Sequence, residues 1–198
     1  MKLVFKGKYS GDETTLPQRE HPENYKMFKE PDSKKFMLIA NGVSLAITVV
    51  VIAIAIIACR SHLMADLKNG KFWLLLISLI LPSLIIIPHE LLHAICFKDT
   101  VFLYSYFQQG AMFVLGLEDM SKARFTYMSL LPNIIFGFIP FIAGIIFPQL
   151  YWLAIFGALA IGSGAGDYIN VFNALTQVAK GGKIYMCGFH SYWYLPEN

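Results

Sequence analysis

Three polar residues inside a long apolar stretch have the types and spacing needed to bind a metal ion and activate water. His89, Glu90 and His93 form the pattern H-E-x-x-H within the segment PHELLHAICF, residues 88–97. Positions i and i+4 share one face of a helix, so both imidazoles can bind one ion. Neutral imidazoles suit zinc, and Glu90 can then take a proton from a water on that ion. The pattern predicts a catalytic zinc site with His89 and His93 as ligands and Glu90 as general base.

The surroundings of the motif bear on the alternatives, which are a chance match or two core histidines with structural hydrogen bonds. A random chain of this length would contain the pattern with a chance on the order of one per cent. The flanking residues are almost wholly apolar. Ionisable groups are costly in such an environment and usually serve a function there. A functional metal site is therefore favoured.

The composition points to an integral membrane protein. Of 198 residues, 56% are hydrophobic and 15% are charged, with a mean hydropathy of +0.54. The net charge of +3 comes without a basic run, so we expect no nucleic-acid partner. The first 35 residues are polar, so we expect no cleavable signal peptide.

The three cysteines do not predict a second kind of site. Cys59, Cys96 and Cys187 lack C-x-x-C spacing, so they indicate neither a disulfide framework nor a cysteine metal site. Cys96 follows His93 by three residues and could approach the metal, but a buried thiol is the favoured interpretation.

Four segments are long and apolar enough to cross a bilayer core of about 30 Å. The sequence thus predicts an all-α integral membrane protein with about four transmembrane helices and a small β-hairpin between the second and third. The expected spans are residues 36–59, 72–97, 125–147 and 150–178. The expected divisions are a cytosolic N-terminal tail, a four-span membrane domain with the zinc site and a cytosolic C-terminal tail, at residues 1–35, 36–179 and 180–198.

Several prolines lie within these spans, at positions 82, 88, 132 and 140. A proline removes one helical hydrogen bond and kinks the helix, which can open a path for water. At Pro88, directly before His89, a bend that serves packing alone is an equal alternative.

Short strands are expected outside the spans. Residues 100–107 and 111–117 are rich in β-branched and aromatic types, with Gln108-Gln109-Gly110 as the connecting loop. An interfacial helix is the alternative for this stretch. Residues 1–9 alternate like an edge strand, and residues 184–189 and 191–195 can pair. His190, between the last two, is expected to be a surface or turn histidine rather than a ligand.

Lysine and arginine are distributed unevenly between the two ends of the expected spans. The two tails and the loop after the second span carry 13 of the 16, and the opposite side carries Arg60, Lys68 and Lys71. The positive-inside rule then predicts a multi-pass protein of the cell membrane with both termini in the cytosol.

A catalytic zinc usually takes three protein ligands, so two histidines leave one position open. Of the 13 acidic residues, only Glu90 and Asp167 lie inside apolar spans. His89 and Asp167 each lie 17 residues into parallel spans, at a depth of about 25 Å. Small residues at 162–166 would let the helices approach closely. Asp167 is therefore the expected third ligand.

Two acids near the hairpin, Asp99 and Glu118, are the competing third ligands. Asn170, three residues after Asp167, is a candidate to orient that carboxylate or to contact a substrate.

The H-E-L-L-H segment at 89–93 and Gly166-Asp167 two spans later resemble the site-2 protease class of intramembrane zinc metalloproteases. More closely, the chain resembles a bacterial membrane family of putative zincin peptidases. The resemblance covers roughly residues 70–195 and includes Lys122–Pro132, the G-D-Y-I-N segment and the GFHSYWY segment. It implies His89, His93 and Asp167 as zinc ligands and Glu90 as general base. Gly166-Asp167 reverses the Asp-Gly order of site-2 proteases.

These observations predict a membrane-embedded zinc metalloprotease that cleaves a membrane or membrane-proximal protein. Its expected partners are the lipid bilayer and a protein or peptide substrate, with the oligomeric state left open. The alternative is a non-proteolytic membrane protein with a structural or regulatory zinc site. Metal transport is disfavoured, because nothing ionisable lines the outer half of the spans.

Overall fold

The computed structural model describes residues 1–31, 33–106 and 110–197, and the chain divides into two compact units. The strand-rich unit comprises Met1–Glu30, Ile86–Leu130 and Ile169–Asn198. The helical unit comprises Pro31–Ile85 and Leu131–Tyr168. Each unit has a hydrophobic cluster of its own. Two helices, α4 (Lys122–Pro132) and α7 (Ala165–Gln177), run from one unit into the other.

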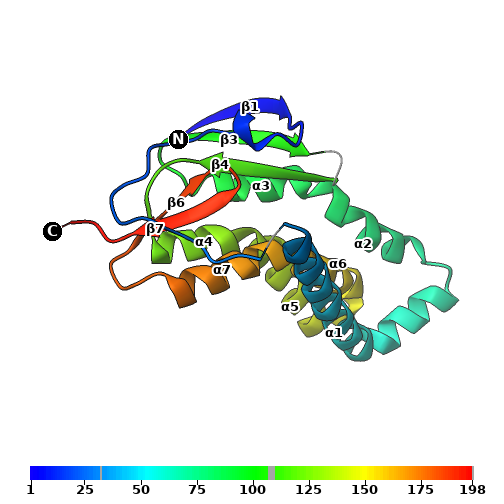
Figure 1. Cartoon of the computed structure of the whole chain (residues 1–198). Helices are drawn as coiled ribbons and strands as arrows, with labels where there is room; N and C mark the ends of the chain where they lie inside the picture. The colour runs from blue at the N-terminus through cyan, green and yellow to red at the C-terminus, as the bar shows by residue number, and fades with distance from the viewer. Residues whose placement is uncertain (32, 107–109, 198) are drawn as a thin grey trace. The chain divides into compact units, whose positions relative to one another are not determined.

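The helical unit is organised around α6 (Tyr151–Ser163), on which its other long helices pack (Figure 1). α6 is apolar on all sides, as expected for a helix that is covered all round. A side chain at Gly157 would collide with the backbone of Phe141, so this glycine lets α5 and α6 approach closely. The surrounding elements are α1 (Ser33–Lys68), α2 (Trp73–Leu84), the π-helix η3 (Asn133–Phe138), α5 (Ile139–Ile146) and η4 (Pro148–Leu150).

Between two and four apolar helices of the described chain are long enough to cross a membrane. Lys35–Lys68 and Lys122–Ile146 qualify as single helices and include most of the expected first and third spans. The expected second and fourth spans are helix pairs, each bent at a short break. The four-span prediction is therefore met only if each bent pair is one span.

The strand-rich unit contains two small sheets (Figure 1). In the first, β3 lies between β1, with which it is parallel, and β4, with which it is antiparallel. The second is antiparallel, in the order β2-β7-β6-β5. The strands are β1 (Lys2–Lys8), β2 (Lys26–Met27), β3 (Thr100–Tyr106), β4 (Ala111–Gly116), β5 (Met120–Ser121), β6 (Lys183–Cys187) and β7 (His190–Tyr194). A short 3-10 helix, η1 (Glu13–Thr15), follows β1.

The expectation of an all-α protein with one hairpin is wrong, because strands from both ends of the chain enter the two sheets. The hairpin itself is present as β3 and β4, not an interfacial helix. Its expected loop residues Gln108 and Gln109 lie outside the described residues. β1 extends the hairpin into a sheet, and the C-terminal pair at 183–194 forms the centre of the second sheet. The chain is an α+β protein with a helical unit and a strand-rich unit.

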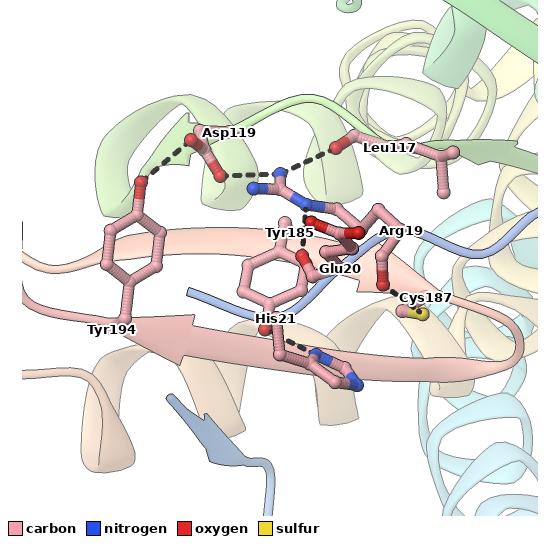
Figure 2. Close-up of polar contacts among 8 residues, drawn as sticks. All are labelled: Arg19, Glu20, His21, Leu117, Asp119, Tyr185, Cys187 and Tyr194. Atoms are coloured by element: carbon pink, nitrogen blue, oxygen red, sulfur yellow. Dashed lines mark hydrogen bonds and ion pairs between the residues drawn. The ribbon is translucent and has the colours of Figure 1, made fainter. Parts of the chain in front are cut away.

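The N-terminal segment is attached to the second sheet by Arg19 (Figure 2). Its Nη1 donates to the Leu117 carbonyl at 2.8 Å and to Asp119 Oδ1 at 2.9 Å. The Tyr194 hydroxyl donates to the other oxygen of Asp119 at 2.8 Å. The guanidinium also lies 4.4 Å from the ring centre of Tyr185. Burial raises the pKa of Tyr185 to about 12, although the positive charge of Arg19 acts to lower it.

We expect Arg19→Ala to lower the free energy of unfolding by about 1–3 kcal/mol, because charge-assisted hydrogen bonds to two groups are lost. Chemical unfolding of the full chain in detergent measures this, and hydrogen exchange at residues 117–119 should also speed up. Lys29→Ala is the matched control, because its side chain is exposed and its backbone makes its bonds to Gln177. Equal stability of the two variants would contradict the attachment.

Candidate metal centre

The H-E-x-x-H motif lies on α3 (Ile86–Ala94), which begins directly after a break in the helix at Ile85. Pro88 explains the break. It has no N–H to donate to the carbonyl of Leu84, four residues earlier, and Leu84 is the last residue of α2. Within α3, Pro88 stands in the first turn, where N–H groups have no helical partner in any case. The proline therefore lies at the start of the helix that carries the H-E-x-x-H motif, and it does not bend that helix in the middle.

α3 packs against the hairpin and is anchored by residues near its end. Ala94, Phe97 and Met128 belong to one buried cluster, together with residues of both sheets. Gly116, at the end of β4, allows the ring of Phe97 to pack against its backbone, since a Cβ there would collide with that ring. The helix that carries the histidines is thus held within the strand-rich unit.

His89, Glu90 and His93 converge on one point. One ligand atom from each lies within 4.8 Å of the other two. The two Nε2 atoms of His89 and His93 are 3.2 Å apart. His93 is buried, with 6% of its surface exposed, and the other two residues are half-buried. A search of the described residues for three or more His, Cys, Asp or Glu side chains that could hold one metal ion finds this group.

The orientation of His93 is determined by a backbone carbonyl of α4. His93 Nδ1 is 2.8 Å from the Met128 oxygen. A carbonyl oxygen only accepts hydrogen bonds, so Nδ1 carries the proton and a neutral His93 has its lone pair on Nε2. Metal-binding histidines usually donate their other N–H to a carbonyl or carboxylate in this way.

The geometry fits zinc. Two nitrogens bound to a tetrahedral zinc at about 2.0–2.1 Å lie about 3.3 Å apart. The 3.2 Å between the Nε2 atoms agrees with this spacing. Glu90 follows His89 directly, and its carboxylate belongs to the same group. Its nearness to the histidines suits a proton acceptor for a water molecule at the metal.

The C-terminal end of α3 is held by a charged pair. The Arg124 guanidinium donates to the Cys96 carbonyl through Nε at 2.8 Å and Nη2 at 2.5 Å. Arg124 also pairs with Glu118 at 2.5 Å, and the side chain of Glu118 is 8% exposed. Basic groups at a helix C-terminus are favourable because the last carbonyls have no helical donor. The pair fixes the end of the motif helix to the segment between β4 and α4.

These contacts bear on the hairpin acids proposed as competing ligands. Glu118 Oε2 accepts the backbone N–H groups of Lys98 and Asp99, at 2.7 and 2.6 Å. Its other oxygen faces Arg124. The metal-competent group found among the described residues contains none of the three candidate third ligands, Glu118, Asp99 and Asp167. Glu118 is instead a structural carboxylate, and its neighbours Leu117 and Asp119 gave no sign of this role in the sequence.

Asp167 lies in the helical unit, at the start of α7. Its Oδ2 accepts a 2.7 Å hydrogen bond from the side-chain amide of Asn133. Asn133 is 1% exposed, and its Oδ1 accepts from the Tyr168 hydroxyl at 3.2 Å. Asn170 stays a candidate to orient this carboxylate or to contact a substrate. The partner that the structure shows, Asn133, lies 34 residues before Asp167 in another span, and no local spacing relates the two.

The small-residue run before Asp167 has the expected packing role. The break between α6 and α7 falls at Gly164, and a Cβ there would collide with the Asn133 side chain. A Cβ at Gly162 would collide with Thr48 of α1. Glycine at these positions lets the helix backbones approach closely. The run thereby makes room for the Asn133–Asp167 contact.

A helix that directs two imidazoles and a carboxylate to one point is the arrangement expected of a zincin-type metal centre, and His89, Glu90 and His93 are the candidate residues for it. The comparison with known families agrees. The chain belongs to the family described as putative zincin peptidase, whose model matches residues 82–182. The match includes the whole of α3, α4 and α7. The family suggests a zinc metalloprotease and, with it, zinc binding. No curated protein and no solved structure matches the chain.

We expect Arg124→Ala to destabilise the protein by about 3–5 kcal/mol, because it leaves the buried Glu118 carboxylate without its cation. Glu118→Gln should cost less. The double variant Glu118→Gln/Arg124→Ala should be more stable than the two single effects added together would give, by about 1–3 kcal/mol. Chemical unfolding in detergent measures the cycle. Strict additivity would show that the pair is not coupled.

Proposed function

We propose that this chain is a membrane-embedded zinc metalloprotease that hydrolyses peptide bonds of membrane or membrane-proximal proteins. The convergence of His89, Glu90 and His93 on one point is the observation that carries the proposal. Apolar helices long enough to span a bilayer support the membrane setting. The likeness to site-2 proteases and the cytosolic placement of both termini stay predictions from sequence.

The residues divide the chemistry as follows. His89 and His93 hold the metal through Nε2, and His93 is kept in the required tautomer by Met128. Zinc, when bound, supplies a Lewis acid that polarises the scissile carbonyl and acidifies a water molecule. Glu90 removes a proton from the attacking water and delivers it to the leaving nitrogen, which keeps the proton count balanced.

Asp167 is our proposed third ligand. It and Glu90 are the acids within the apolar spans, where an unused carboxylate would be costly. Metal-binding carboxylates are commonly held by a second hydrogen bond, and Asn133 gives Asp167 such a partner. The carboxylate would complete a His-His-Asp set and leave one position open for water.

The substrate strand has a candidate binding place on β4. In the described sheet, β4 is an edge strand, with β3 on its other side. It also packs against α3, which carries the motif. An extended peptide can pair with an open strand edge through backbone hydrogen bonds. We propose that the scissile segment is presented beside α3 in this way.

Glu90→Gln should abolish cleavage, with a loss of about 10²–10⁴-fold, while zinc stays bound. His89→Ala should lose the zinc itself. His190→Ala is the control and should change neither, because His190 lies on β7, facing Glu13 and Glu30. Metal analysis of purified protein gives the zinc content, and comparison of membrane proteomes from wild-type and Glu90→Gln cells gives the cleaved substrate. Full cleavage by Glu90→Gln would refute the protease.

Asp167→Asn should weaken zinc binding by at least about tenfold, because an amide replaces a charged ligand. Asp99→Asn is the matched control and should leave the affinity unchanged. Competition with a chromophoric chelator measures both dissociation constants. If Asp99→Asn weakens zinc binding and Asp167→Asn does not, the third ligand lies in the hairpin region.

A further inference from the structure

We propose that Pro132 is a positioning residue of the metal centre, because it leaves the Met128 carbonyl open to accept the hydrogen bond from His93. The inference rests on the zinc site proposed above, and it assigns to Pro132 a task that it performs through two other residues. The group that contacts His93 is the backbone carbonyl of Met128, and the side-chain types in the sequence do not indicate its role.

The first step is the spacing along α4. In an α-helix, the carbonyl of residue i accepts from the N–H of residue i+4. Met128 and Pro132 are four residues apart in the same helix. Proline has no N–H, so the Met128 carbonyl has no donor at position 132. The proline ring also crowds the carbonyl four residues earlier and turns it away from the helix axis.

The second step is the need to satisfy the freed oxygen. Met128 is 5% exposed and Pro132 is fully buried, so water has little access to this carbonyl. A buried carbonyl without a donor costs free energy. His93 Nδ1, at 2.8 Å, provides the donor. This hydrogen bond gives the Met128 carbonyl the donor that residue 132 does not provide.

The third step links this bond to the metal. Because Nδ1 of His93 donates to Met128, Nε2 is the nitrogen with the lone pair. Nε2 is also the atom that lies 3.2 Å from His89 Nε2. Without the Met128 carbonyl, the His93 ring could adopt the other tautomer or rotate. The Nε2 atoms of His89 and His93 would then no longer be positioned to bind one ion. Pro132 therefore acts on metal affinity through Met128 and His93.

The backbone after Pro132 shows that the disturbance of the helix is retained. The π-helix η3 begins at Asn133, and the Ile139 N–H bonds to the Ile134 carbonyl, five residues earlier. π-helical turns often occur at functional sites, because they shift the helix register locally. The altered hydrogen-bond pattern of this span begins next to the residue that frees the Met128 carbonyl.

The test restores the missing N–H. In Pro132→Ala and Pro132→Gly, the amide of residue 132 can bond to Met128 and compete with His93. We expect the zinc dissociation constant of the full chain in detergent to rise about three- to tenfold in both variants. In the metal-free protein, ¹⁵N spectra of histidine should show His93 losing its pure Nδ1–H form. Pro140→Ala, in the same apolar span, is the control and should match wild type.

The two variants separate a hydrogen-bond effect from a general loss of helix stability. Alanine and glycine differ by about 1 kcal/mol in helix propensity but add the same N–H. Similar losses of affinity support the proposal, whereas wild-type affinity and an unchanged His93 tautomer in both would overturn it, as would a loss confined to glycine. If wild type binds no zinc, the proposed function fails, and the His93 tautomer in the metal-free variants still decides the role of Pro132.

Discussion

The hydrogen bond from His93 Nδ1 to the Met128 carbonyl is the contact on which the proposed metal chemistry of this chain depends. It joins the motif helix to α4 at a point where both partners are buried. An imidazole in such a place must have its nitrogens satisfied, and the way this is done decides which nitrogen faces the metal. The hydrophobic cluster around Ala94, Phe97 and Met128 then keeps the two helices in register.

The same requirement explains the hydrogen bonds of Asn133 and Tyr168 in the apolar helices. Asn133 connects Asp167 to Tyr168, whose hydroxyl also bonds to the Ile161 carbonyl at 2.9 Å. Without water, such groups must be satisfied by the protein itself. Glu118, which follows β4, and Arg124, in the first turn of α4, satisfy polar groups at the end of α3 in the same way. Small residues such as Gly164 then leave space for these contacts.

The sequence predicted that His89, Glu90 and His93 lie together, and it predicted the apolar helices, because each depends on composition or on spacing within one helix. It predicted the hairpin and the C-terminal strand pair for the same reason. It missed the fold class, because the pairing of β1 with β3 joins residues about a hundred positions apart. It also missed Met128, whose side chain gives no sign that its carbonyl matters, and Asn133, whose partner lies 34 residues away.

Pro132 and Asn133 are consecutive, yet one frees the partner of His93 and the other holds Asp167. Each residue of an α-helix turns the chain by about 100°. A single residue inserted between the two would rotate one support away from its target while the other stayed in place. The number of residues at the junction of Pro132 and Asn133 is therefore as constrained as the identity of these two side chains. Insertions and deletions among relatives should lie in other segments.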